Sequence, residues 1–163
     1  IYDALDGEVG AVVAGCGTAG TLMGIAKYAR EQDPDTYIAA VEPEGSLYAE
    51  TKGEDVEEGE YKIEGIGTHD PSTNELFDPD LVDDVVRVAD RAAQDELKRL
   101  AREEGLLVAS SAGAAGVAAR AVAERISDGD VDAPHDSVVT VFPDSSARYL
   151  SKGIYRSFEE WAS

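Results

Sequence analysis

The sequence has little of what disulfides and metal sites require. Its 163 residues include one cysteine, Cys16, and two histidines, His69 and His135. A single cysteine excludes an internal disulfide and any multi-cysteine metal site. The two histidines lie far apart in the sequence, and neither has the spacing of a metal-ligand pair. We therefore expect no metal site and no zinc catalysis.

Long apolar segments and a leader are also missing. No run approaches the roughly 20 residues that cross a bilayer, and the most apolar stretch, residues 106–119, is broken by two serines and two glycines. No signal peptide is evident, so a cytoplasmic protein without membrane contacts is expected. The chain starts at Ile1 without a methionine, which suggests a fragment of a longer protein.

Basic residues are scarce. The chain has 14 Lys and Arg against 34 Asp and Glu, for a formal net charge of −20. This balance argues against nucleic acid or an anionic membrane as a partner. The acidic residues are spread along the chain and only five residues are lysine, a composition typical of the solvated surface of a halophilic protein.

Short apolar runs and amphipathic segments alternate along the chain. A continuous apolar run is typical of a strand buried on both faces, whereas apolar residues three or four apart indicate a helix. Strands are expected at Val9–Ala14, Tyr37–Val41 and Val138–Phe142, and Leu81–Val88 is expected to be a strand or a strand-helix mixture. Helices are expected at Leu22–Ala29, Asp90–Glu104 and residues 114–126. Asp90 is expected to cap the second helix, and Gly105 to end it. The pattern predicts a single α/β domain, residues 1–163, with an open, mainly parallel twisted sheet and helices on both faces.

A Gly-rich loop, residues 15–21, joins the first strand to the first helix. Backbone N–H groups and the helix dipole in this position bind phosphate. Three glycines of the loop have the G-x-G-x-x-G spacing, and Glu42 lies at the end of the next strand, which together match an NAD(P)-binding Rossmann domain of an oxidoreductase. Thr18 and Thr21 instead favour a terminal phosphate, whose three oxygens accept additional hydroxyl donors. A tight turn that needs glycine for backbone reasons, and a stand-alone phosphate-ligand binding module, are the further alternatives.

A second small-residue segment, residues 110–114, follows the apolar run 106–109 and is expected at another strand-to-helix transition. Its serines could simply cap the helix. Because ligands bind at the carboxyl ends of parallel strands, a hydroxyl here could also meet the far end of a ligand whose phosphate lies in the first loop. Residues 143–145 end the last strand and are expected at the same edge.

The order of the motifs resembles the C-terminal half of the cysteine synthase and cystathionine β-synthase family, pyridoxal-phosphate (PLP) enzymes of fold type II. After the Gly/Thr loop, the matching segments are Val41–Ser46, Glu64–Gly67, Glu104–Leu107, Ser111–Gly113, Phe142–Ser145 and Arg148–Ser151. The resemblance covers about Val9 to Lys152. It implies a PLP-dependent β-replacement that makes cysteine or cystathionine from a serine-type amino acid and a thiol, in an enzyme that is commonly a homodimer.

The resemblance also assigns roles to residues of this chain. The cofactor phosphate would be held by Gly17, Thr18, Ala19, Gly20 and Thr21. Ser111 would face the pyridine nitrogen, where a neutral hydroxyl suits elimination and replacement better than transamination. The loop Glu64, Gly65, Ile66 and Gly67 would close over the substrate.

Several residues depart from the family's pattern. The family usually has glycine at Ala19, so the backbone is expected to approach a ligand slightly more closely there. Thr68 and His69 stand where the β-synthase branch has a tyrosine, which leaves the thiol, homocysteine or sulfide, open. The family's Schiff-base lysine lies in the N-terminal half, and no lysine here has a comparable motif. This chain is therefore expected to hold no catalytic residue and to be inactive by itself.

Cys16 and His69 each allow two interpretations. Cys16 lies beside a helix N-terminus, which lowers thiol pKa values, or it is a small residue that fills a tight loop. His69 either faces the substrate as part of the closing loop or is an exposed loop residue.

Overall fold

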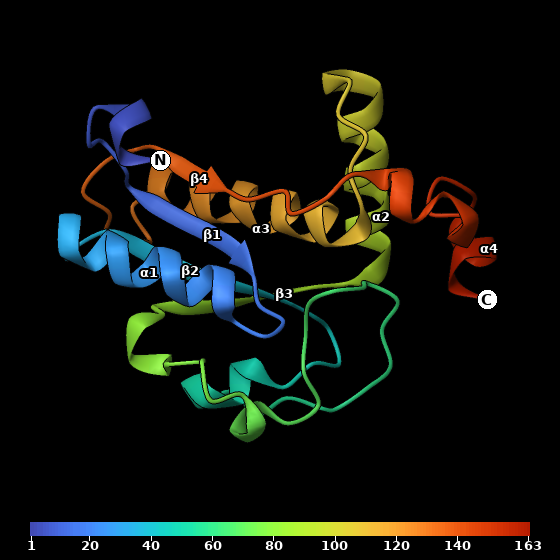
Figure 1. Cartoon of the computed structure of the whole chain (residues 1–163), viewed down its shortest axis with the longest axis horizontal. Helices are drawn as coiled ribbons and strands as arrows, with labels where there is room; N and C mark the ends of the chain where they lie inside the picture. Colours follow the sequence, from blue (N-terminus) through green and yellow to red (C-terminus); the bar gives the residue numbers. More distant parts are fainter.

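The computed structural model describes all 163 residues. Four strands form one fully parallel sheet in the order β3-β2-β1-β4 (Figure 1). Their bounds are β1 Ala11–Gly15, β2 Tyr37–Pro43, β3 Asp84–Val88 and β4 Val138–Thr140. The α/β class and the parallel sheet expected from the sequence are confirmed.

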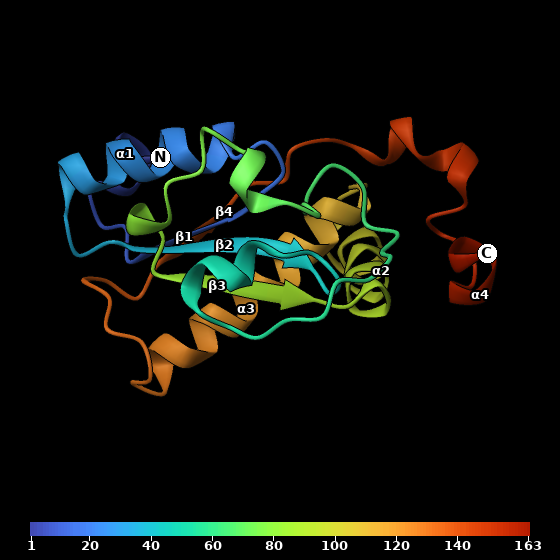
Figure 2. The same cartoon turned by 90° about the horizontal axis from the view of Figure 1, so that it is seen from below.

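Helices cover both faces of the sheet. Their bounds are α1 Gly20–Gln32, α2 Asp90–Arg99, α3 Ser110–Ser127 and α4 Phe158–Ala162. Figure 2 shows α1 on one side of the strands and α3 on the other. The alternation of side chains along β1 explains the two layers: Val12 and Ala14 pack on the side of α1, whereas Ala11 and Val13 belong to the core on the side of α3.

The alanine-rich α3 lies very close to α2. A Cβ on Gly113 would stand 2.2 Å from the carbonyl oxygen of Ala93, so this helix crossing requires glycine. The helix cap predicted at Asp90 is wrong: Ala89 is the N-cap, and the Asp90 carboxylate instead accepts the N–H groups of Lys62 and Ile63. A π-helical turn, Leu100–Glu104, follows α2, and Gly105 ends it with φ +70° as predicted.

Two strand assignments need correction. β4 ends at Thr140 rather than Phe142, because it lies at the sheet edge and pairs only with residues 11–13 of β1. The run 106–109 is not a strand; it contributes one isolated antiparallel bridge, Val108 to Ser145. Residues 110–114 therefore form the first turns of α3 rather than a loop after a strand, and Ala109, not a serine, is the N-cap.

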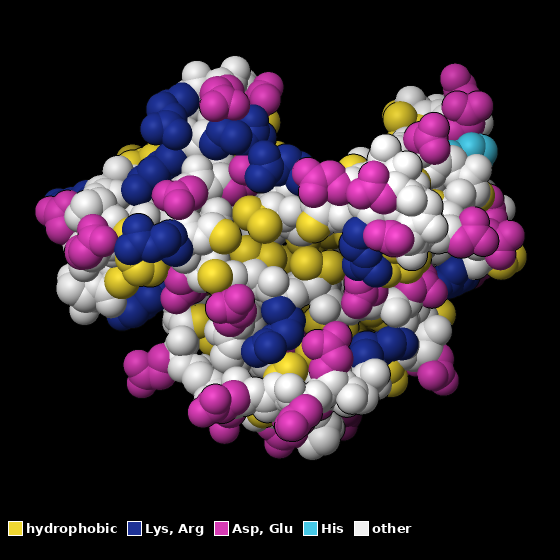
Figure 3. All heavy atoms as spheres, turned by 180° about the vertical axis from the view of Figure 1, so that it is seen from behind, with side chains coloured by type: hydrophobic (Ala, Val, Ile, Leu, Met, Phe, Trp, Pro, Cys, Tyr) yellow, Lys and Arg dark blue, Asp and Glu magenta, His cyan; other side chains and the backbone are white.

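Acidic side chains are distributed over the face shown in Figure 3 rather than gathered in one patch. The longest apolar helical segments remain too short or too polar to span a membrane. No group of three or more His, Cys, Asp or Glu side chains is arranged to hold a metal ion.

Candidate cofactor site

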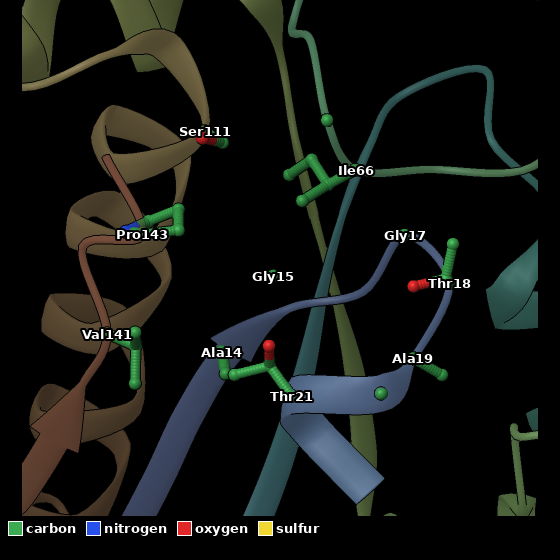
Figure 4. A pocket seen from close by; sticks show the side chains of 12 residues that line it. Ala14, Gly15, Gly17, Thr18, Ala19, Thr21, Ile66, Ser111, Val141 and Pro143 are labelled. Atoms are coloured by element: carbon green, nitrogen blue, oxygen red, sulfur yellow. The ribbon is translucent and has the colours of Figure 1, made fainter. Parts of the chain in front are cut away.

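A cavity of about 120 Å³ lies at the carboxyl end of β1, where the first turns of α1 and α3 meet the loop that contains Ile66 (Figure 4). It is lined by Ala14, Gly15, Gly17, Thr18, Ala19, Gly20, Thr21, Gly65, Ile66, Ser111, Val141 and Pro143. Two segments that the sequence suggested, residues 15–21 and Ser111, thus border the same space. No lysine or arginine lines it.

The backbone of the Gly-rich loop carries a row of free donors. The N–H groups of residues 17–21 donate to no acceptor in the protein. Buried or half-buried N–H groups are nearly always paired, and helix N-termini leave theirs available for an anion. Five consecutive free N–H groups just before and at the start of α1, together with the helix dipole, have the arrangement that binds an anion without a basic side chain.

Three hydroxyl groups extend this donor set. The side chains of Thr18 and Thr21 face the cavity from the loop, and Ser111 borders it from α3 on the opposite side (Figure 4). None of the three hydroxyls makes a hydrogen bond within the protein, although Ser111 is 4% exposed. The cavity can therefore offer hydroxyl contacts to both ends of one ligand.

The segment 64–67 packs directly on the Gly-rich loop. A Cβ on Gly17 would lie 2.5 Å from the Gly65 carbonyl oxygen, and one on Gly15 would lie 2.6 Å from Ile66 Cγ2. The Gly67 N–H donates to the Cys16 carbonyl at 2.7 Å. Gly17 is therefore required by the approach of a backbone atom from a distant segment, whereas a side chain at position 15 would displace the Ile66 side chain.

Residues outside the cavity hold the segment 64–67 from its other side. Lys152 Nζ lies 2.6 Å from both carboxylate oxygens of Glu64, and the Glu64 N–H donates to Ser110 Oγ at 3.3 Å. Ser110 thus anchors this segment to α3, while its neighbour Ser111 faces the cavity.

Ala19 is in a conformation that favours glycine. Its φ is +63°, in the left-handed region, and the residue is 2% exposed. The missing glycine thus has a consequence within the protein itself, because the alanine side chain strains the backbone in this conformation.

Replacing Ala19 with glycine is therefore expected to stabilise the protein. Left-handed backbone costs an alanine about 1–2 kcal/mol, and the greater freedom of glycine in the unfolded chain offsets about half of this gain. Urea unfolding should show a net increase of about 0.5–1 kcal/mol. Ala123→Gly in α3 is the control and should destabilise by about 1 kcal/mol. Equal destabilisation by both variants would show that Ala19 is not strained.

The interpretation of Cys16 as a low-pKa thiol is wrong. The residue is fully buried in the core, and burial, together with the nearby charge of Glu42, raises the pKa of its thiol to about 12. Cys16 fills a tight loop.

At pH 8 the Cys16 thiol of the folded protein is expected to stay unmodified by iodoacetamide, because it is both protonated and inaccessible. The same reaction in 6–8 M urea provides the fully labelled control by mass spectrometry. Labelling of the native protein at the rate of the unfolded chain would contradict the buried placement.

Glu42 is not available to a dinucleotide ribose. It is completely buried, and its two oxygens accept the N–H groups of Tyr48 and Ala49 at 2.7 and 3.0 Å. The carboxylate that completed the dinucleotide pattern in the sequence instead caps the turn at residues 48–52. The geometry thus argues against the Rossmann interpretation.

Of the other sequence candidates, only Pro143 borders the cavity. His69 is exposed: its Nδ1 lies 3.1 Å from Glu58 Oε1, and its ring stacks on that of Tyr61. These contacts favour the second interpretation, an exposed loop residue. Pro143 lines the cavity, but Asp144 and Ser145 do not.

Comparison with known proteins identifies the family. A family model described as pyridoxal-phosphate dependent enzyme matches residues 1–144. The chain belongs to this family. The chain is 39% identical to a Bacillus subtilis O-acetylserine dependent cystathionine beta-synthase over 155 residues. The aligned residues cover 95% of this chain and 46% of that protein. A Helicobacter pylori cysteine synthase is 41% identical over 144 residues, 88% of this chain and 42% of the relative.

Solved structures of the family agree with the fold. The crystal structure of an O-acetylserine dependent cystathionine beta-synthase from Helicobacter pylori superposes with a TM-score of 0.78 at 40% identity, covering 95% of this chain and 46% of that one. A cysteine synthase from Entamoeba histolytica gives a TM-score of 0.81 at 27% identity, with 96% and 43% coverage. The chain thus spans less than half the length of these relatives, and the family resemblance drawn from its motifs is confirmed.

Sequence reasoning missed two residues that contact the Gly-rich loop. Tyr48 and Asn74 both donate hydrogen bonds to the Gly17 carbonyl. Tyr48 is an isolated aromatic in a polar stretch, which is a weak sign of burial, whereas nothing in the sequence distinguishes Asn74.

Proposed function

We propose that this chain is the cofactor-binding, C-terminal part of a PLP-dependent β-replacement enzyme. The parent protein would exchange the β-substituent of a serine-type amino acid for a thiol and so form cysteine or cystathionine. One observation carries the proposal: in a member of this family, residues with five free N–H groups and three free hydroxyls line one cavity.

The donors in the cavity fit the two ends of PLP. The N–H groups of residues 17–21 and the Thr18 and Thr21 hydroxyls would bind its phosphate, for which backbone donors at a helix N-terminus suffice. Ser111 would hydrogen-bond the pyridine nitrogen from α3. PLP supplies the electron sink when bound, and a neutral hydroxyl at the nitrogen leaves that nitrogen unprotonated more readily than a carboxylate would.

The segment 64–67 would cover the substrate. Gly65 and Ile66 line the cavity and also an adjoining open groove of about 500 Å³, so this segment separates the two spaces. A loop in this position can exclude water from the reacting groups. The Glu64–Lys152 ion pair and the bond to Ser110 would hold it in place.

The lysine that binds PLP covalently is proposed to lie outside this chain. None of the five lysines lines the cavity. Lys52 donates to the carbonyls of Pro79 and Val82, and Lys152 pairs with Glu64. The relatives are more than twice as long as the segment they share with this chain, which leaves room for that lysine.

We further propose a homodimeric, cytoplasmic protein adapted to high salt. The net charge of −20, the five lysines and the dispersed acidic surface support the halophilic assignment. The dimer is expected from the family resemblance, and nucleic acid is not expected as a partner.

The reaction is tested with the full-length protein in concentrated potassium chloride. PLP is added with either L-serine or O-acetylserine, and with either sulfide or homocysteine, and amino-acid products are identified by mass spectrometry. Formation of cysteine or cystathionine, dependent on PLP, is the expected result, and the productive pair identifies both substrates. Absence of both products in all four combinations would contradict the proposal.

A further inference from the structure

The Gly17 carbonyl accepts two hydrogen bonds from residues far away in the sequence. The Tyr48 hydroxyl donates at 2.5 Å and Asn74 Nδ2 at 3.1 Å, and Asn74 Nδ2 also donates to the Tyr48 oxygen. We propose that Tyr48 and Asn74 are positioning residues that fix the Gly17–Thr18 peptide for phosphate binding. This inference rests on the proposed function.

The orientation of that peptide decides where the Thr18 N–H points. A trans peptide is planar, so its carbonyl and the following N–H point in opposite directions. With the Gly17 carbonyl held by Tyr48 and Asn74, the Thr18 N–H is turned away from them, and it donates to no group in the protein. Glycine at position 17 would otherwise let this peptide rotate. Two hydrogen bonds donated to the Gly17 carbonyl remove that rotational freedom before the ligand arrives.

The two donors are themselves rigid. Tyr48 is completely buried, its ring packs on Phe77 with centroids 4.6 Å apart, and its N–H is held by the buried Glu42. Burial raises the pKa of the Tyr48 phenol, so the hydroxyl stays protonated and remains a donor at all physiological pH values. Asn74 Oδ1 accepts the N–H of Leu76 at 3.3 Å, which orients the amide with its nitrogen toward Gly17.

The contacts also connect the phosphate loop to two separate parts of the chain. Tyr48 belongs to the 3₁₀ turn Tyr48–Lys52 that follows β2, and Asn74 ends the turn Pro71–Thr73. Neither Tyr48 nor Asn74 lines the cavity, and Asn74 borders only the adjoining groove of about 500 Å³. Their role is thus to position the loop and not to touch the cofactor.

The test compares the wild-type protein, in full length, with Tyr48→Phe and Asn74→Ala. Tyr48→Phe removes one hydroxyl and keeps the ring packing. The ligands are PLP and pyridoxal, which lacks the phosphate, with dissociation constants measured by absorbance titration. The PLP constant should rise about 10-fold in Tyr48→Phe and about 5-fold in Asn74→Ala, whereas the pyridoxal constant should stay within about 2-fold.

Tyr37→Phe is the matched control. Its hydroxyl also has two partners, Asp84 and Arg125, but it lies at the start of β2, away from the cavity. Tyr37→Phe should change the stability of the protein without changing the ratio of the dissociation constants of PLP and pyridoxal. An unchanged ratio in Tyr48→Phe, or the same change in Tyr37→Phe, would overturn the positioning role.

Inorganic phosphate provides a test that does not depend on PLP. Phosphate should raise the melting temperature of the wild-type protein more than that of Tyr48→Phe. If phosphate raises the melting temperature of the wild type but the wild type does not bind PLP, the proposed function fails. The positioning role is then supported by a smaller rise in melting temperature in Tyr48→Phe. Equal phosphate responses in the two proteins, including none in either, would overturn the positioning role.

Discussion

Replacing Gly17 with alanine is expected to weaken PLP binding by at least about 100-fold and to lower the free energy of unfolding by about 1–3 kcal/mol. The new Cβ would stand 2.5 Å from the Gly65 carbonyl oxygen, and a backbone atom cannot rotate out of the way. The Gly-rich loop, residues 15–21, and the segment 64–67 must then move apart. Because the proposed phosphate site needs its N–H groups in one relative orientation, this separation should remove most of the site.

The measurement for Gly17→Ala is a PLP titration combined with urea unfolding. Gly24→Ala is the matched control, since Gly24 lies in α1 and a Cβ there meets no atom within 4 Å. The control should bind PLP like the wild type and should gain about 0.5–1 kcal/mol of stability from helix propensity. Wild-type PLP affinity in Gly17→Ala would show that the loop does not need its close contact with Gly65.

Replacing Ser111 with alanine is expected to reduce the turnover of the parent enzyme about 100-fold. The hydroxyl makes no hydrogen bond in the protein and borders the cavity opposite the phosphate loop, so its proposed partner is the pyridine nitrogen. The phosphate contacts are untouched, and PLP affinity should therefore stay within about 3-fold of the wild-type value.

The Ser111→Ala measurement separates turnover from PLP affinity in the full-length enzyme. The exposed Ser145, which does not line the cavity, provides the control variant Ser145→Ala, with unchanged turnover expected. Wild-type turnover in Ser111→Ala would remove Ser111 from the proposed site. A parallel loss of PLP affinity and turnover would show that the Ser111 contact contributes mainly to cofactor affinity and would contradict its proposed effect on turnover alone.

Local patterns predicted the layers of the fold well, because strands and helices buried on defined faces carry a strong periodic signal. The run Val9–Ala14 identified β1, and its alternation determines which helix covers each face. The run 106–109 was misleading, since an apolar segment becomes a strand only where a neighbouring strand is free to pair. Here only Val108 finds a partner, Ser145.

The candidate site was partly visible in the sequence for a similar reason. The glycines and threonines of residues 15–21 are contiguous, and a continuous motif can be recognised without knowledge of the fold. Tyr48 and Asn74 reach Gly17 across 31 and 57 residues, and such contacts arise only from tertiary packing. The fate of Glu42 is similar: its spacing matches a ribose-binding carboxylate, but its burial against the turn at Tyr48 is a property of the fold.

The central claim is that residues 17–21 hold the PLP phosphate through backbone N–H groups. Phosphorus NMR of the PLP-loaded, full-length protein between pH 5.5 and 8 tests it most directly, because the second pKa of a free phosphate monoester is about 6. Dipoles and N–H donors favour the dianion, so the pKa of the bound phosphate should fall below this range and its chemical shift should remain constant. A bound-PLP resonance that titrates near pH 6 like free PLP would contradict the claim.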